Sequence, residues 1–336
     1  MKKFQKKPAK GARKTFRFLW ITDPWHFLAH AGDTTLRLAE EAELLGHESY
    51  WADVRSLRFD GKVTIQAQRL RYPVKGGVPE RLAENTYVPR DFNSIHWRMD
   101  PVVDATYLHP LMLLTLGLRE PGKNKRKTEI VNPPELLHGM NEKLEPFGFS
   151  AAPPSIVSSQ WEVLSRFGQK EGQAVIKPLD LCQSKGIALL SWKSPEDVEE
   201  AHQYIEQITE NFRRPVLLQR YLPEIKNGEL RVWFLDGKVL ATARKFPVKG
   251  DFRVNIDRGS RIEKATLSAS ERSSLRSISL HLKKLNIRLA AVDLIGSYVT
   301  DFNFTSPGLL RDLERLNGKN LARPIIEALA SARKKP

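Results

Sequence analysis

The sequence contains little cysteine and no long apolar run. Cys182 is the single cysteine among 336 residues, so no intrachain disulfide and no cysteine-rich zinc site can form. No stretch approaches the roughly 18 apolar residues that a membrane-spanning helix requires. The basic N-terminus is not followed by the apolar segment of a secretory signal. We therefore expect a cytoplasmic protein with no membrane partner.

Two common nucleotide-binding motifs are also missing. The chain has no G-x-x-x-x-G-K-[ST], which excludes a P-loop, and no G-x-G-x-x-G after its first expected strand, which argues against a dinucleotide fold. Its histidines, including His26, His96, His138 and His281, show no metal-ligand spacing, and we expect them to be structural or exposed. A nucleotide or metal would therefore have to be bound through other residues.

Positive charge is abundant and partly confined to one end. The formal net charge is +15; residues 1–14 hold seven Lys or Arg and no acid, which leaves +8 for the rest. A tail of this composition can bind nucleic acid, but a disordered, solubilising tail is the simpler interpretation, and we expect no nucleic-acid partner. The basic body suits anionic substrates such as nucleotides and acidic peptides.

Apolar patterns predict an α/β protein. A buried strand at 15–21, a helix capped by Asp33 and ending near 45, and a strand at 49–53 give the strand–helix–strand order of doubly wound sheets. We expect the following further elements: strands at 95–98, 130–132, 174–177 and 216–219, a helix at 195–212, a hairpin of 230–235 with 238–243 around Asp236-Gly237, a helix carrying Leu275, Ile278, Leu282 and Leu285, and a final strand pair at 288–295 and 298–304.

Oxygen-bearing side chains gather on the final strand pair. Asp301 and Asn303 are two residues apart in a strand, so both point to one face, and Asp293 lies on the preceding strand. A three-residue connection at 296–298 would set Asp293 opposite Asp301, whereas a two-residue turn would separate their faces. Two carboxylates and an amide suit Mg²⁺, a hard cation. The alternative is a solvated face of an edge hairpin.

Several cations could bind phosphate or carboxylate groups. Lys177 ends an apolar strand and could point into a cleft, and Lys143 is a weaker candidate. Arg231, Arg253 and Arg261 surround the hairpin and the loop that follows it, and arginine binds both anions bidentately. Each of these cations could equally be an ordinary surface charge.

The order of short motifs resembles that of prokaryotic glutathione synthetases, a family of the ATP-grasp superfamily. The stretches that carry the resemblance are Trp97-Arg-Met-Asp-Pro-Val-Val-Asp104, Val131-Asn-Pro-Pro, Asn141-Glu-Lys-Leu144, Ile176-Lys-Pro-Leu-Asp180, residues 219–228, Arg231-Val, Phe252-Arg-Val-Asn255 and residues 292–307. Residues 221–228 and 293–307 are the most specific of these.

The resemblance implies a fold and a set of site residues. It implies an ATP-grasp fold preceded by a Rossmann-like pre-ATP-grasp domain, with a tail at 1–14, an N-terminal domain at 15–132 and an ATP-grasp domain at 133–330 whose lid spans about 150–215. The implied roles are ATP binding by Lys143, Lys177, Gln219, Tyr221 and Leu222, metal binding by Asp293, Asp301 and Asn303, catalysis by Arg231 and Arg253, and substrate binding by Arg98, Asn255 and Ser306.

The resemblance also implies a reaction. ATP with Mg²⁺, or Mn²⁺ in its place, would activate the carboxylate of γ-glutamylcysteine as an acyl phosphate, which the amine of glycine would attack. The family is often tetrameric, so a homo-oligomer is one expectation. Two alternatives stay open: an ATP-grasp ligase for another amino acid or peptide, and a non-catalytic ATP-grasp binding protein.

The chain departs from the family pattern near the expected phosphates. The family's glycine-rich loop reads here Asp180-Leu-Cys-Gln-Ser-Lys-Gly186, with one glycine, and Lys185 could substitute as a charge. Asp301 stands where the family has the longer glutamate, and Lys245 where it has arginine. These differences bear on the substrate more than on the fold.

Overall fold

The computed structural model describes residues 15–28, 32–73, 75–100, 102–119, 128–181, 184–256 and 259–331. The basic tail at 1–14 and Cys182 therefore lie outside the described residues.

The N-terminal part is built on a seven-stranded sheet. Its path is β3-β4-β2-β1-β6-β7, with β5 paired to β4. The centre, β2-β1-β6-β7, is parallel, and β1 is buried on both faces as its apolar sequence predicts. The strands are β1 (Arg17–Thr22), β2 (Glu48–Asp53), β3 (Arg58–Phe59), β4 (Val63–Arg71), β5 (Glu80–Tyr87), β6 (Ser94–Trp97) and β7 (Glu129–Val131).

Helices connect the parallel strands of this sheet. Helix α1 (Thr34–Leu44) begins where expected, because the Asp33 side chain accepts a hydrogen bond from the Leu36 N–H at 2.7 Å. Helices α2 (Ala105–Arg119) and α3 (Pro134–Gly139) follow β6 and β7. Helix α2 and strands β3, β4 and β5 are not among the elements expected from the sequence.

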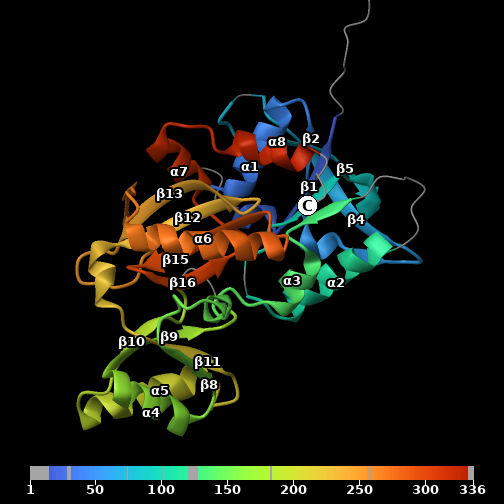
Figure 1. Cartoon of the computed structure of the whole chain (residues 1–336). Coiled ribbons are helices and arrows are strands. Elements are labelled where there is room, and N and C mark those ends of the chain that lie inside the picture. Colours follow the sequence, from blue (N-terminus) through green and yellow to red (C-terminus); the bar gives the residue numbers. More distant parts are fainter. Residues whose placement is uncertain are drawn as a thin grey trace, which may run out of the picture.

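A small lobe projects from the main body (Figure 1). Its four-stranded antiparallel sheet has the order β10-β9-β11-β8 and carries two helices. These elements are β8 (Ser155–Ser158), α4 (Trp161–Glu171), β9 (Gln173–Pro178), β10 (Ala188–Ser191), α5 (Pro195–Ile208) and β11 (Val216–Arg220). Helix α5 starts at its Ser194 cap as expected, but it ends at 208 rather than 212, because residues 210–212 have positive φ angles that cannot continue a helix.

Gly168 in α4 packs directly against the ring of Trp192. A Cβ at this position would overlap the Trp192 ring, whereas a Cβ at Gly139, near the end of α3, would meet nothing within 4 Å. We expect Gly168→Ala to destabilise the lobe by about 1–3 kcal/mol or more through overpacking, and Gly139→Ala to be neutral or stabilising. Limited proteolysis and thermal unfolding of the two variants measure this difference; equal stability would contradict the packing described here.

The C-terminal part contributes a five-stranded antiparallel sheet of order β14-β13-β12-β15-β16. Its first hairpin turns at Asp236-Gly237, whose φ angles of 48° and 70° fit the type I′ turn that this dipeptide predicts. Helix α6 packs with Leu275, Ile278 and Leu282 buried. The elements are β12 (Glu229–Leu235), β13 (Lys238–Phe246), β14 (Arg261–Lys264), α6 (Ala269–Lys284), β15 (Leu289–Ile295), β16 (Tyr298–Asn303), α7 (Leu310–Asn317) and α8 (Ala322–Ala330).

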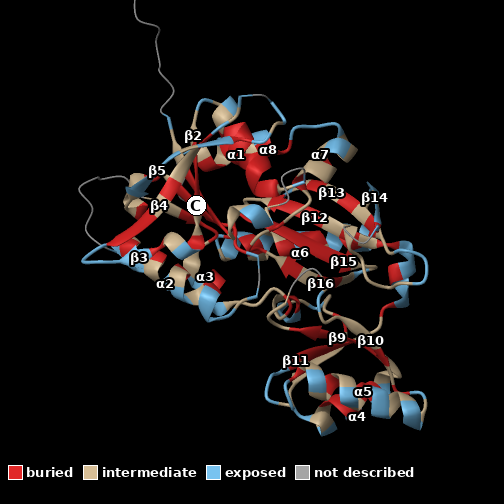
Figure 2. Ribbon diagram, turned by 180° about the vertical axis from the view of Figure 1, so that it is seen from behind, coloured by how far each residue is buried: buried red, intermediate tan, exposed pale blue. Residues whose placement is uncertain are grey.

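The N-terminal and C-terminal sheets share their apolar cores, whereas the small lobe has its own. Trp97 and Tyr107 lie in one cluster with Val232 and Phe302, and Trp20 lies in a second with Ile325. The lobe's core is separate and is built around Ile176. Figure 2 shows the buried strands continuing through the main body and the exposed outer faces of α4 and α5. The small lobe is therefore not part of the apolar cores of the main body, although hydrogen bonds such as Lys177 to the Thr300 carbonyl and Arg220 to the Tyr298 hydroxyl connect the two.

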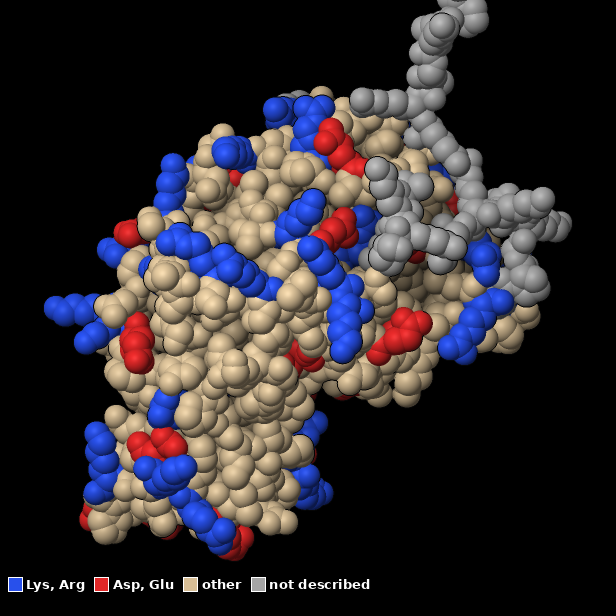
Figure 3. Space-filling model, viewed as in Figure 1, with Lys and Arg blue, Asp and Glu red and all other residues tan. Residues whose placement is uncertain are grey.

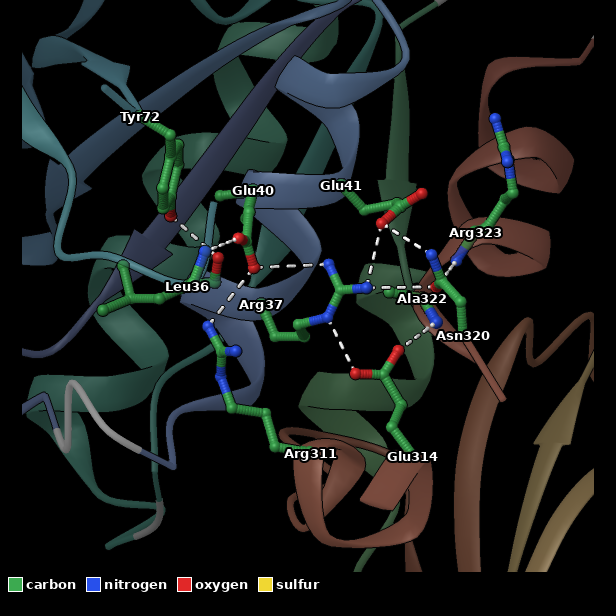
Figure 4. A network of polar contacts seen from close by, with 12 residues as sticks. Leu36, Arg37, Glu40, Glu41, Tyr72, Arg311, Glu314, Asn320, Ala322 and Arg323 are labelled. Carbon is green, nitrogen blue, oxygen red and sulfur yellow. Dashed lines mark hydrogen bonds and ion pairs between the residues drawn. The ribbon is translucent and has the colours of Figure 1, made fainter. Parts of the chain in front are cut away.

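A buried ionic network fastens the C-terminal helices to α1 (Figure 4). Arg37 of α1 contacts Glu40 and Glu41 on its own helix and Glu314 of α7, at 3.4, 2.9 and 2.8 Å. Glu314 in turn accepts hydrogen bonds from the backbone N–H groups of Leu321 and Ala322, at the start of α8. The network holds α1, α7 and α8 in one arrangement.

Among the described residues there is no membrane-spanning helix, and on one face there is no continuous basic stripe. No helix among the described residues combines the length and apolar character of a membrane span. On the face shown in Figure 3, Lys and Arg lie in separate groups with Asp and Glu between them. That face, where it is described, lacks the continuous basic stripe typical of nucleic-acid-binding domains.

Candidate functional site

Strands β15 and β16 bring the two predicted carboxylates together. The connection is a two-residue turn, Gly296-Ser297, which on a regular ladder would set Asp293 and Asp301 on opposite faces. A register shift near Thr300 adds one residue to β16, and the pairing Asp293↔Asp301 results nonetheless. Both side chains face the same cavity, between the small lobe and the C-terminal sheet. The solvated-edge alternative is thereby excluded for Asp293, which is buried.

Asp293 is held by two cations from neighbouring strands. Arg231 on β12 donates bidentately, from Nε to Oδ1 at 2.8 Å and from Nη2 to Oδ2 at 2.5 Å. Lys245 on β13 lies 3.4 Å from Oδ1 and 2.5 Å from Glu229. Burial by itself would raise the pKa of Asp293, but Arg231 and Lys245 outweigh it and hold that pKa well below its usual range. Asp293 is therefore ionised at any physiological pH.

The donor set fits a Mg²⁺ ion that also binds phosphate. Asn303 uses its amide hydrogens on Asp293 and on the Ala291 carbonyl, at 3.2 and 3.1 Å, so its amide oxygen remains available as a ligand beside Asp301. Within the described ranges, no three His, Cys, Asp or Glu side chains form an all-protein metal site. Mg²⁺ usually takes one or two carboxylates and completes its shell with water and substrate phosphates, which matches this set.

Two lysines line the same cavity. Lys177, on β9 of the small lobe, donates to the carbonyl of Thr300 at 3.3 Å, and Lys143 donates to the carbonyl of Leu181. Burial lowers the pKa of Lys177, while Asp301 and Glu229 partly offset that effect. Lys185, exposed on the loop that carries the single glycine, also lines this cavity. The cations and carboxylates together can bind a magnesium polyphosphate.

Part of the lining of this first cavity comes from the segment where β11 leaves the small lobe, and it includes apolar side chains. Gln219, Tyr221 and Leu222 line it together with Val175 and Ile225. Gln219 and Leu222 are buried, and the Gln219 amide donates to Ser155 Oγ at 3.4 Å. An apolar slot with polar groups at its rim suits a planar base.

A second cavity adjoins the first. It is lined by the remaining predicted substrate residues, Arg98, Asn255 and Ser306. Arg98 is buried and donates to Thr35 Oγ1 at 3.1 Å and to the Pro307 carbonyl at 3.0 Å. The residues common to both cavities are Glu142, Ser184, Arg231, Lys245, Val254 and Asn303. Each residue to which the resemblance assigns a role, Arg253 included, therefore lines one cavity or both. Arg261, the remaining candidate cation, lines neither and lies 2.8 Å from Glu263. None of His26, His96, His138 and His281 lines either cavity.

Five acidic residues that line the cavities were given no site role from the sequence: Glu142, Glu229, Asp33, Asp100 and Asp312. Glu229 lies two residues before Arg231 and forms an ion pair with Lys245. Burial raises the pKa of Glu229, and Lys245 only partly offsets this effect. Glu142 lies in the quoted Asn141-Glu-Lys-Leu144 stretch, where only the lysine was given a role. Its Oε1 accepts hydrogen bonds from the N–H groups of Phe304 and Thr305 and from the Thr305 hydroxyl, each at 2.8 Å. Its adjacency to Lys143 was the one available signal.

Glu142 makes the stability of the unliganded protein depend on pH. Burial, with a smaller contribution from Asp301, raises the pKa of Glu142 from 4.5 to about 6. The hydrogen bond from the Thr305 N–H acts in the opposite direction and lowers this pKa. Between these two pH values the folded state keeps a proton that the unfolded state has lost, so this residue's contribution to stability falls as pH rises.

We therefore expect Glu142→Gln to gain stability relative to wild type as pH rises from 4.5 to 7, by about 2 kcal/mol for a shift of this size. Urea unfolding of both proteins in EDTA at several pH values measures the difference. A difference that does not change with pH would contradict the shift.

Comparisons with known proteins agree with this geometry. The model of the prokaryotic glutathione synthetase ATP-grasp domain matches residues 142–318, and that of the N-terminal domain matches residues 16–138. A glutathione synthetase from Prochlorococcus marinus subsp. pastoris is 30% identical over 315 residues, covering 93% of this chain and 98% of the relative. One from a Nostoc species is 29% identical over 328 residues, covering 93% and 97%.

Solved structures with the same architecture are more distant in sequence. The D-cycloserine synthetase DcsG has a TM-score of 0.66 at 16% identity and covers 94% of this chain and 98% of its own. The ATP-grasp ligase PsnB, in a complex with its minimal precursor, Mg and ADP, has a TM-score of 0.56 at 16% identity, with 93% and 96% covered. At these identities the likeness concerns the fold.

Two sheets that face each other across a cavity lined by carboxylates and lysines define an ATP-grasp ligase, an enzyme that forms carbon–nitrogen bonds. The expected α/β fold class is confirmed. Within that class, the chain belongs to the prokaryotic glutathione synthetase family, as its motif order predicted. Members of the superfamily bind ATP and magnesium.

Proposed function

We propose that this enzyme is a glutathione synthetase, which uses ATP to join the cysteine carboxylate of γ-glutamylcysteine to the amine of glycine. The observation that carries the proposal is the junction of two cavities at Arg231, Lys245 and Asn303, beside the carboxylate pair. A nucleotide in the first cavity would present its terminal phosphate to a peptide in the second. The family membership supports the choice of substrates.

The first cavity then receives Mg·ATP. Gln219, Tyr221 and Leu222 enclose the adenine, Lys143 and Lys177 bind the phosphates as point charges, and the final strand pair supplies the metal ligands. The ligands are Asp293, Asp301 and Asn303, with Mg²⁺ as the expected ion and Mn²⁺ as the alternative. The metal would neutralise charge on the transferred phosphoryl group.

The chemistry follows from the poor reactivity of a carboxylate. Phosphorylation converts it into an acyl phosphate with a good leaving group; the amine then forms the new C–N bond as the C–O bond to phosphate breaks, and phosphate departs. Arg231 stabilises the charge that develops at the junction, and Arg253, in the loop over the cavity, helps to exclude water. Arg98, Asn255 and Ser306 bind the substrates.

The domain limits belong to the same proposal. Residues 15–132 form the pre-ATP-grasp domain and residues 133–330 the ATP-grasp domain, with residues from about 150 to 215 acting as a lid over the nucleotide. The separate apolar core of the small lobe supports its movement as a unit. The family resemblance further supports a cytoplasmic homo-oligomer.

The altered phosphate loop favours one second candidate, a ligase for a different peptide or amino acid. Gly186 has a φ of +66°, and a Cβ there would lie 2.8 Å from Pro178 Cγ, so the single glycine is required for the shape of the loop. The other backbone positions of this loop that the family fills with glycine carry side chains here, which changes what fits beside the phosphates.

A phosphate-release assay distinguishes these candidates. The enzyme with Mg·ATP is given γ-glutamylcysteine and glycine, then a panel in which the acid or the amine is replaced. Release that requires both γ-glutamylcysteine and glycine, with the tripeptide seen by mass spectrometry, supports the proposal. Release with a different pair establishes the second candidate, and release with none of them overturns both.

A further inference from the structure

Three consecutive carbonyl groups, at residues 179–181, lead from β9 into the phosphate loop and accept hydrogen bonds from the main body. Asn141 Nδ2 donates to the first carbonyl at 2.8 Å, and the Val103 N–H donates to the second at 3.3 Å. The Lys143 ammonium donates to the third. The entry to the phosphate loop is therefore held by two segments outside the small lobe, one that follows β6 and one that follows α3.

Asn141 uses both ends of its side-chain amide. Its Oδ1 accepts a hydrogen bond from the Lys143 backbone N–H at 2.9 Å, while its Nδ2 donates to the Leu179 carbonyl at 2.8 Å. Asparagine can do this because its amide carries a donor and an acceptor on one short side chain. Asn141 itself lines neither cavity, so a ligand in either cavity leaves both of its hydrogen bonds in place.

The hydrogen bond from Lys143 differs from the other two because Lys143 lines the first cavity. A phosphate in that cavity is an anionic acceptor, and a lysine binds it more strongly than it binds a backbone carbonyl. When the ammonium moves from the Leu181 carbonyl to a phosphate, the loop loses one of the three hydrogen bonds. The bonds from Asn141 and Val103 then keep the loop beside the cavity.

We propose that Asn141 is a positioning residue that couples the phosphate loop to Lys143, so that both meet the polyphosphate of Mg·ATP in one fixed arrangement. This inference rests on the proposed function, which supplies the place of the phosphates, and adds a residue outside both cavities. A loop and a lysine that are aligned before ATP arrives need not be ordered by ATP, and this preorganisation strengthens binding.

The variant Asn141→Ser removes the coupling without changing charge. A serine hydroxyl can still accept from the Lys143 N–H, as serine does in turns, but its shorter side chain does not reach the Leu179 carbonyl. We expect the KM for ATP to rise about threefold to tenfold, the factor that one hydrogen bond contributes, with the KM for the amine substrate unchanged. The matched change Asn85→Ser, at an exposed residue of β5, should alter neither KM.

Adenosine separates positioning of the phosphates from a general loss of structure. Calorimetric titration with Mg²⁺ and a non-hydrolysable ATP analogue should show weaker binding to Asn141→Ser by the factor given for the KM. Adenosine has no phosphate, so in competition measurements it should bind Asn141→Ser and wild type equally well. If the two ligands lose the same factor, or if the ATP analogue loses nothing, the inference is overturned.

Lys185, an exposed residue of the phosphate loop, reports the position of the loop without any ligand. Trypsin should cut after Lys185 faster in Asn141→Ser than in wild type, because a loop that is released from the body opens more often. Cutting after Lys193, an exposed lysine elsewhere in the small lobe, should proceed at the same rate in both proteins. Equal rates at Lys185 would show that Asn141 does not hold the loop.

These measurements keep the inference distinct from the proposed function, because none of the binding or proteolysis experiments needs γ-glutamylcysteine. If γ-glutamylcysteine and glycine support no turnover but Asn141→Ser selectively weakens the ATP analogue, the proposed function fails and the inference stands. If the tripeptide forms but Asn141→Ser binds the analogue as wild type does, the inference fails and the proposed function stands. A wild-type protein that does not bind the analogue overturns both.

Discussion

Replacing Asp293 by asparagine should reduce ATP-dependent phosphate release about a thousandfold or more. The change removes one of two carboxylates available to the metal and the buried partner of both Arg231 and Lys245. A metal ion on a transferred phosphoryl group is worth several kcal/mol in the transition state, and about 4 kcal/mol corresponds to a thousandfold in rate. Steady-state kinetics at saturating ATP and Mg²⁺ measure the loss.

The control for this prediction is Asp60→Asn, at an exposed residue in the turn between β3 and β4. That variant should keep wild-type activity. Calorimetric titration should show that Asp293→Asn binds ATP with a weaker dependence on magnesium than wild type. An Asp293→Asn variant that retains a tenth of the activity would place the metal elsewhere.

Replacing Arg37 by alanine should destabilise the fold by about 3–5 kcal/mol. Arg37 is 6% exposed, and its guanidinium bridges Glu40, Glu41 and Glu314, two of which are as deeply buried as the arginine itself (Figure 4). Its loss leaves three carboxylates close together, with Arg311, 3.5 Å from Glu40, as the remaining cation. Breaking a buried ion pair by removing one partner costs this much because the residual charge is uncompensated.

Arg55→Ala provides the comparison at the surface. Arg55 contacts Asp53 at 2.8 Å but is largely exposed, and such pairs contribute about 0–1 kcal/mol. Urea unfolding of both variants gives the two free-energy differences. If Arg37→Ala costs no more than Arg55→Ala, the network does not hold α7 and α8 against α1.

Local signals in the sequence predicted those elements whose stability is decided locally. The apolar run of β1 predicted a strand that is buried on both faces. Asp33 and Ser194 predicted the starts of α1 and α5 as N-caps, and Asp236-Gly237 predicted the turn of the hairpin. These features depend on a few neighbouring residues. The prediction of α5 was too long because the positive φ angles at residues 210–212 have no signal in the sequence pattern.

Elements stabilised by distant partners were missed. Strand β5 is almost wholly exposed and carries little apolar alternation, so its pairing with β4 is what identifies it as a strand. Helix α4 was also not predicted, although its sequence does carry the helical pattern: Trp161, Leu164 and Phe167 are spaced three residues apart and pack in the core of the lobe. The register shift near Thr300 depends on pairing with β15, and no short-range pattern indicates it.

The candidate site divides in the same way. The period of two in a strand predicted that Asp301 and Asn303 share a face, and the structure sets Asp293 opposite Asp301. The place of Glu142 depends on hydrogen bonds from residues more than 160 positions later in the chain. Motif spacing carries no information of that kind.

The central claim is that the joined cavities activate a carboxylate by phosphorylation and pass it to an amine. The most direct measurement uses γ-glutamylcysteine labelled with ¹⁸O in its cysteine carboxylate, together with glycine and Mg·ATP, and follows the isotope in the released phosphate. An acyl-phosphate route places one labelled oxygen in each phosphate released. Unlabelled phosphate, released while the tripeptide forms, would contradict the account.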